Sequence, residues 1–117
     1  MRDLKELKVW ERSHKLCLLI YDATKEFPSE EKFGIISQIR RASSSVPTNI
    51  SEGCGHDSSK EFARYLRIAS GSISEVEYLL ILSNDLDYLN EKQASDLLNQ
   101  TIQIRKMLYN LVKAIAQ

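Results

Sequence analysis

Apolar residues along this chain recur every three or four positions, which is the spacing that places them on one face of an α-helix. The pattern predicts four helices, over Leu7–Glu26, Lys32–Glu52, about 58–89 and about 91–115. No stretch alternates apolar and polar residues in the way of a half-buried strand. The sequence therefore predicts an all-α fold.

Helix-breaking and capping residues separate the four patterns. Phe27 and Pro28 end the first helix, because the residue before a proline leaves the helical region. Gly53 and Gly55 are expected to end the second helix, since glycine accepts the left-handed conformation of a helix cap. The last two helices begin with the spacing of a capping box, in which two side chains bond the first amides: Ser58 with Glu61, and Asn90 with Gln93.

Short connections between the four patterns force successive helices to run antiparallel. We therefore expect residues 1–117 to form one domain, an antiparallel up-down-up-down four-helix bundle. The third helix has more apolar residues than one seam needs. A wide stripe of this kind either faces two neighbouring helices or contacts a partner subunit. The residues beside its main stripe are Tyr65, Ile68, Leu80 and Leu82.

The second helix breaks local helix rules while keeping the helical period. Pro47 lies inside it, so we expect the helix to continue with a bend, and we expect Ser43 or Ser44 to satisfy the carbonyl that Pro47 frees. Polar side chains also form a strip along this helix. The strip is either a solvated face or a buried polar network at a subunit interface. This polar stripe comprises Gln38, Arg41, Ser45, Asn49 and Glu52.

Composition places the chain among ordinary globular domains, with 117 residues, 43% hydrophobic and 27% charged. The two cysteines, Cys17 and Cys54, are interpreted as cytosolic thiols. The polar start Met1–Glu6 lacks the apolar segment of a signal peptide, and the longest apolar run, Leu16–Tyr21, is far below the about 18 residues of a membrane span. We therefore expect a cytoplasmic protein with no membrane partner.

The charges are balanced overall but unevenly distributed. Sixteen basic and sixteen acidic residues cancel, yet the bundle end that holds both termini and the Gly53–Ser58 loop carries more basic than acidic residues, and the other end the reverse. Such an end is either solvated surface or a phosphate-binding face. Its basic residues are Arg2, Lys5, Lys8, Arg12, Lys15, Lys60, Arg64, Arg67, Arg105, Lys106 and Lys113.

Candidate chemistry is sparse. His14, Cys17, Cys54 and His56 are enough ligands for zinc, but antiparallel pairing leaves residues 54–56 roughly 12–15 Å from residue 14 along the axis. We therefore predict no metal site, no cofactor and no catalytic residue. Gly71, among small residues, indicates either a close approach of two helices or a ligand niche.

Segments along almost the whole chain carry a resemblance to one family: Leu7–Trp10, Phe27–Pro28, Phe33–Gly34, Gln38–Ala42, Val46–Gly53, Glu61–Phe62, Tyr65–Ala69, Gly71–Ser72 and Glu75. In these segments the chain resembles the small bacterial four-helix bundles encoded in intervening sequences of 23S ribosomal RNA genes. The accessory protein of diversity-generating retroelements is similar. The resemblance implies a ring, in known cases a homopentamer, and no established reaction.

We therefore expect a non-enzymatic homo-oligomer that binds RNA, DNA or a reverse-transcriptase-like enzyme through its basic end. The alternative is a structural or regulatory homo-oligomer that acts only through protein–protein contacts. The expected nucleic-acid-binding residues are Lys60, Arg64, Arg67, Lys8 and Arg12. The expected oligomer contacts are Arg41, Ser45, Asn49, Glu52, Tyr65 and Ile68.

Overall fold

The structure, a computed structural model, describes residues 3–115, and these residues contain four α-helices and no strand. The prediction of an all-α protein with four helices is confirmed. Short 3-10 turns at Leu4–Glu6 and Ser29–Glu31 precede the first two helices. The α-helices are α1 (Lys8–Thr24), α2 (Ile35–Cys54), α3 (Ser59–Asp85) and α4 (Glu91–Ile115).

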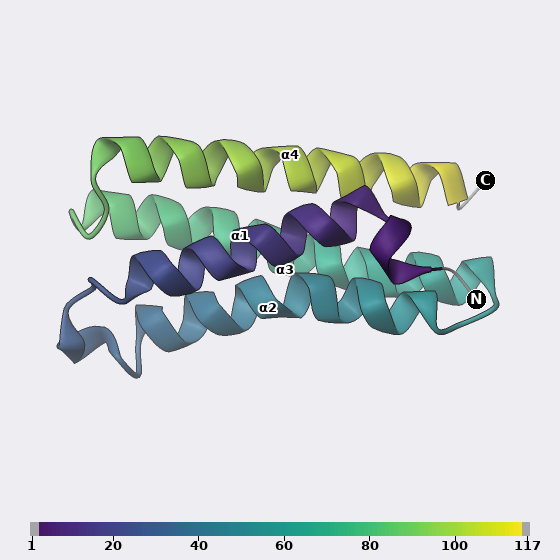
Figure 1. Cartoon of the computed structure of the whole chain (residues 1–117), viewed down its shortest axis with the longest axis horizontal. Helices are drawn as coiled ribbons and strands as arrows, with labels where there is room; N and C mark the ends of the chain where they lie inside the picture. Colours follow the sequence, from purple (N-terminus) through teal and green to yellow (C-terminus); the bar gives the residue numbers. More distant parts are fainter. Residues whose placement is uncertain (1–2, 116–117) are drawn as a thin grey trace.

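Each helix packs against two neighbours. α1 and α3 both contact α2 and α4, while the two diagonal pairs make no close backbone contact in the described part of the chain. Successive helices run in opposite directions along a bundle of 43 × 23 × 20 Å (Figure 1). The start of α1, the α2–α3 connection and the last turns of α4 therefore lie at one end, called here the terminal end (Figure 1). Arg2, expected there, lies outside the described residues.

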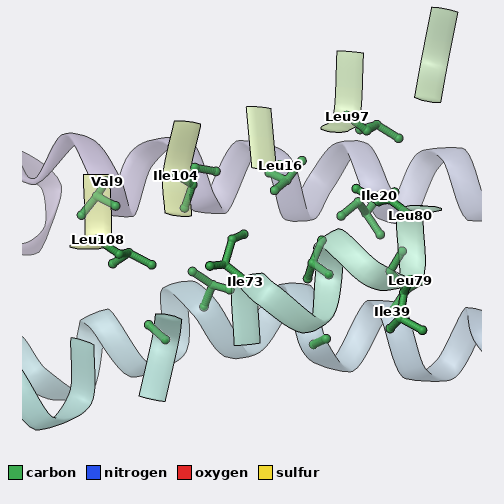
Figure 2. Close-up of a cluster of buried hydrophobic side chains, with 14 of the residues drawn as sticks. Val9, Leu16, Ile20, Ile39, Ile73, Leu79, Leu80, Leu97, Ile104 and Leu108 are labelled. Carbon is green, nitrogen blue, oxygen red and sulfur yellow. The ribbon is translucent and has the colours of Figure 1, made fainter. Parts of the chain in front are cut away.

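The core is a column of aliphatic side chains between the four helices. Figure 2 shows Leu16 from α1, Ile39 from α2, Ile73 from α3 and Ile104 from α4 turned toward this shared interior. Ile104 is buried, whereas Ile102, two residues earlier on α4, is only half-buried.

Several serine and threonine side chains are also buried, and their hydroxyls donate hydrogen bonds to backbone carbonyls of the same helix. Thr24, Ser83 and Thr101 donate to the carbonyls of Ile20, Leu79 and Leu97, four residues earlier in their own helices. Ser43 donates to the carbonyl of Arg40, three residues earlier, and also contacts Cys17 Sγ of α1 at 3.7 Å. These side chains let helices pack closely without leaving an unsatisfied polar group.

α2 begins at Ile35 rather than Lys32, because the preceding turn is held by side-chain bonds. One carboxylate oxygen of Glu31 accepts a hydrogen bond of 3.3 Å from the backbone amide of Ile35. The other accepts a hydrogen bond of 2.8 Å from the Tyr88 hydroxyl. A Cβ added to Gly34 would lie 2.5 Å from the Glu31 carboxylate. The absence of a side chain at Gly34 therefore gives the carboxylate room to cap α2.

The sequence predicted that Gly53 would help to end α2. In the structure Gly53 lies inside this helix. Gly55 is the C-cap with φ −75°, and no glycine has a positive φ. A Cβ on Gly53 would approach Phe62 Cδ1 to 2.9 Å and Tyr65 Cβ to 3.0 Å. Gly53 is therefore required by the close packing of α2 on α3, not by its backbone conformation.

Pro47 is buried and α2 continues through it, as predicted, while the bend stays a prediction. The hydroxyls of Ser43 and Ser44 donate to the carbonyls of Arg40 and Arg41, one turn earlier. The expectation that these hydroxyls satisfy the carbonyl freed by Pro47 is therefore wrong. A serine hydroxyl in a helix reaches a carbonyl three or four residues earlier in the chain, so neither hydroxyl reaches the carbonyl of Ser43.

Both predicted caps form, one of them only in part. Asn90 and Gln93 bond each other's backbone amides at 2.8 and 3.2 Å, which completes a capping box. The Ser58 hydroxyl accepts a hydrogen bond of 3.2 Å from the Glu61 amide. The Glu61 side chain accepts a hydrogen bond from Arg64 and not from the Ser58 amide, so this capping box is incomplete. α3 ends at Asp85, four residues before the predicted limit, and Asp87 takes the left-handed conformation with φ 62°.

Candidate functional site

Three helices bring basic side chains to the terminal end. Lys8 and Arg12 come from the first turns of α1, Lys60 and Arg64 from the start of α3, and Lys106 from the second half of α4. These helix segments meet there because successive helices run in opposite directions (Figure 1). The structure therefore gathers the predicted basic residues at one end, but not on one surface.

Arg12 lies on the side of the bundle where α1 meets α4. Its Nη1 donates to Gln103 Oε1 at 3.3 Å and contacts Met107 Sδ at 3.8 Å. Lys8 is exposed and lines a shallow depression with residues of α4. These two residues thus form the α1–α4 part of the basic end.

Arg64 is engaged by its own helix. Its Nε donates to Glu61 Oε2 at 2.9 Å, and its guanidinium lies 4.6 Å from the centroid of the Tyr65 ring. The hydrogen bond from Arg64 lowers the pKa of Glu61, and the same bond raises the pKa of Arg64. Arg64 therefore carries a partly neutralised charge, whereas Lys60 and Arg67 are exposed without such a partner in the described chain.

Tyr65, expected at an oligomer contact, is already covered by its own chain. The His56 ring stacks on Tyr65 with centroids 5.1 Å apart and an interplanar angle of 20°. The guanidinium of Arg64 also packs against the Tyr65 ring. Tyr65 is therefore half-buried within one subunit, with limited area left for a second copy.

The polar stripe of α2 runs partly along the contact with α3. Gln38 Nε2 donates to Glu75 Oε2 at 3.3 Å, and the hydroxyls of Ser45 and Ser72 share a hydrogen bond of 2.8 Å. Asn49 in turn donates to the hydroxyl and the carbonyl of Ser45. Gln38 and Ser45 therefore join α2 to α3 within one chain, and Asn49 supports Ser45.

The two charged residues of the polar stripe, Arg41 and Glu52, do not take part in the packing of α2 on α3. Arg41 and Glu52 are exposed, and neither side chain has a hydrogen bond or ion pair within residues 3–115. Ile68 on α3 is also exposed, to 42%. These three residues are the part of the expected oligomer surface that a single subunit leaves available.

Leu80, beside the main stripe of α3, is buried to 1% exposure because α3 faces both α2 and α4, which is the first of the two alternatives for the wide stripe. Gly71, expected at a close approach of two helices, is exposed, and a Cβ built on it meets nothing within 4 Å. The close approach occurs at Gly53 instead.

A groove between α3 and α4, with a volume of about 800 Å³, was not expected from the sequence. Three of its residues are basic, and one of them, Arg105, pairs with Glu77 at 2.9 Å. Arg67 and Lys106 have no such partner in the described chain. The groove is lined by Arg67, Ser70, Ser74, Arg105, Lys106, Tyr109, Asn110 and Val112.

A signal for this groove was present in the sequence. Tyr109 stands between Arg105–Lys106 and Lys113, so an aromatic residue alternates with basic ones along α4. Tyr109 is exposed to 65%, and the ammonium of Lys113 lies 6.0 Å from its ring centroid. The pairing with α3 could not be anticipated, because it depends on the register of the two helices.

Metal-binding clusters and membrane-spanning helices are both absent from residues 3–115. No group of three or more His, Cys, Asp and Glu side chains is arranged to hold a metal ion. No helix there combines the length and the apolar character that crossing a membrane requires. Cys17 and Cys54 are both buried.

Comparison with known proteins places the chain in a family. Residues 5–110 match the model of the 23S rRNA-intervening sequence protein family, which spans nearly the whole bundle. The chain belongs to this family. A comparison with curated proteins finds no match.

A solved structure supports the assignment of this 23S rRNA-intervening sequence protein. It is the crystal structure of a protein of unknown function from Bacteroides thetaiotaomicron, assigned to the S23 ribosomal protein family. The two chains are 29% identical with a TM-score of 0.82, and the similarity covers 90% of this chain and 95% of the other. The resemblance seen in the sequence is therefore confirmed.

Proposed function

We propose that this protein is a non-enzymatic, ring-forming bundle that binds nucleic acid, or an enzyme that acts on nucleic acid, through its terminal end. The observation that carries the proposal is the convergence there of basic side chains from α1, α3 and α4 on a chain whose total charge is zero. A neutral protein gains a polyanion-binding face only when its charges are segregated in this way.

Assembly would strengthen this binding. A ring in which all subunits point the same way, a homopentamer by resemblance to the family, repeats the basic end around one face. A polyanion that spans several subunits then binds more tightly than the contact with any one of them, because later contacts form intramolecularly. Binding should be weak per subunit, insensitive to base sequence and reduced by salt, since phosphate contacts release counterions.

Charge reversal at the terminal end tests the proposal. A variant with Lys60→Glu, Arg64→Glu and Arg67→Glu should no longer retain a structured RNA or duplex DNA at about 50 mM salt, where phosphate contacts are strongest. A matched control reverses three exposed lysines of the opposite end, Lys25, Lys32 and Lys92, and should leave retention unchanged. If the parent protein binds neither nucleic acid, direct binding of nucleic acid by the terminal end is excluded, and only a protein partner is left for it.

The second candidate function, a structural or regulatory oligomer acting through protein contacts, is favoured by one observation. α3 exposes apolar side chains, with Ile68 at 42%, Tyr78 at 60% and Ile81 at 42%. A second subunit would cover them. Light scattering at micromolar concentration should give a molar mass of several times 13.4 kDa, five times for a pentamer, and a mass of one subunit would exclude both forms of assembly.

A further inference from the structure

The groove between α3 and α4 combines the two features that single-stranded nucleic acids require of a binding surface. Such surfaces pair a positively charged track for phosphates with an aromatic face on which a base can stack. Arg67 and Lys106 supply unpaired charges from opposite walls, and Tyr109 supplies a ring that is 65% exposed. Among residues 3–115, none of those that line the groove is acidic.

The dimensions fit a short stretch of an extended strand. The lining residues run from Arg67 to Ser74 on α3 and from Arg105 to Val112 on α4. Each segment is roughly 10 Å long at 1.5 Å per residue. The volume of about 800 Å³ lies within the range of roughly 300–1,000 Å³ of small-ligand sites. A base with its neighbouring phosphates can therefore enter the groove.

The remaining polar groups suit a nucleotide as well. The Ser70 hydroxyl donates to the Leu66 carbonyl at 3.0 Å, so its oxygen remains available to accept from a base. Ser74 and Asn110 add exposed hydrogen-bonding side chains without charge. These groups allow contacts with base edges, while the arginine and lysine side chains contact the backbone.

We infer that this groove binds single-stranded nucleic acid, with one base against Tyr109 and adjacent phosphates between Arg67 and Lys106. The inference rests on the proposed function and assigns it a site and a preferred strand form. A duplex hides its base faces in the stack, so it reaches only the basic rim of the groove. An acidic peptide would use the cations but leave the Tyr109 ring without a partner.

The experiment compares two labelled RNAs of equal length, an oligouridine and a fully paired duplex, by fluorescence anisotropy with the full-length protein. The parent should bind the oligouridine more tightly. Tyr109→Leu should weaken oligouridine binding about 10-fold and leave duplex binding within about twofold, because only the single strand stacks a base on the ring. The matched control is Phe33→Leu, an aromatic residue of the opposite end that is 91% exposed and lies outside the groove, which should change neither affinity.

A second variant tests the charged walls. Arg67→Gln with Lys106→Gln should weaken oligouridine binding and reduce its salt dependence, since two phosphate contacts are lost. Both side chains are exposed, so circular dichroism should show unchanged helicity.

The outcomes separate this inference from the proposed function. Equal binding of both RNAs, with no effect of Tyr109→Leu, overturns the groove but leaves the basic end as a nucleic-acid surface. Binding of neither RNA overturns both. Displacement of the oligouridine by polyglutamate as effectively as by unlabelled oligouridine would assign the groove to an acidic peptide, and equally tight binding of uridine monophosphate would assign it to a free nucleotide. Either result overturns the inference.

Discussion

Arg40 Nε donates a hydrogen bond of 2.8 Å to the hydroxyl of Thr24, which ties the second turn of α2 to the last residue of α1. Arg40 Nη2 also donates to the Tyr21 carbonyl at 3.0 Å, and the guanidinium lies 4.7 Å from the Tyr21 ring centroid. The last carbonyls of a helix lack backbone donors of their own. Arg40 therefore caps α1 from a neighbouring helix, and its guanidinium packs against the exposed ring of Tyr21.

We predict that Arg40→Ala lowers the free energy of unfolding by about 1.5–3 kcal/mol, the usual contribution of hydrogen bonds to a charged group. Chemical denaturation at several protein concentrations measures this change and separates it from any effect of assembly. A change below about 0.5 kcal/mol, typical of a surface substitution, would show that the cap is not stabilising.

The neighbouring Arg41 should behave in the opposite way. It is exposed and makes no hydrogen bond in the described chain, so Arg41→Ala should keep helicity and the unfolding of a single subunit unchanged. If Arg41 is buried and paired in the ring, the substitution should weaken assembly by about 3–5 kcal/mol. Sedimentation velocity measures the result, and an unchanged distribution would exclude Arg41 from the interface.

Two glycines form a matched pair for testing helix packing. Gly53→Ala should destabilise the fold by about 1–3 kcal/mol, because its Cβ would collide with Phe62 and Tyr65. Gly71→Ala, with open space around its Cβ, should instead stabilise α3 by about 0.5–1 kcal/mol, the helix preference of alanine over glycine. Thermal denaturation distinguishes the two. Stabilisation by Gly53→Ala would show that α2 and α3 are less closely packed than described.

These glycines also show how far the sequence could predict the fold. The three–four spacing of apolar residues located all four helices, and the Asn90 and Ser58 caps were recognised because capping is local. The close approach of two helices was predicted at Gly71 but occurs at Gly53, since spacing alone does not say which side of a helix meets a neighbour. The start of α2 was misplaced because Glu31 bonds Tyr88, which lies far along the chain.

The candidate site was predictable to a similar extent. Charge segregation at the terminal end follows from antiparallel topology, so Lys60 and Arg67 were found from the sequence. The engagement of Arg64 by Glu61, and the groove that joins Arg67 to Lys106 and Tyr109, depend on side-chain geometry and on the register of α3 and α4. The spacing of residues along a single helix predicts neither the Arg64–Glu61 contact nor the groove.

Stability should depend on pH through Tyr88. Its hydrogen bond to Glu31 raises its pKa above the ordinary value of 10.0. Because the folded-state pKa is raised, the stabilisation is fully present below pH 10 and is lost as the pH rises through the higher folded value. The denaturation midpoint of the parent should therefore fall more steeply above pH 10 than that of Tyr88→Phe. Parallel pH profiles of the two proteins would contradict the bond.

The salt dependence of duplex binding tests the central claim, that the terminal end is a polyanion-binding face, most directly. If the terminal end contacts phosphates, a plot of the logarithm of the association constant against the logarithm of the salt concentration should be a falling straight line. Its slope should be about −0.9 for each phosphate contacted. Replacing Lys60, Arg67 and Lys106 with glutamine should reduce the slope, whereas replacing Lys25, Lys32 and Lys92 at the opposite end should not. Equal slopes for the two triple variants, or no duplex binding at about 50 mM salt, would contradict the account.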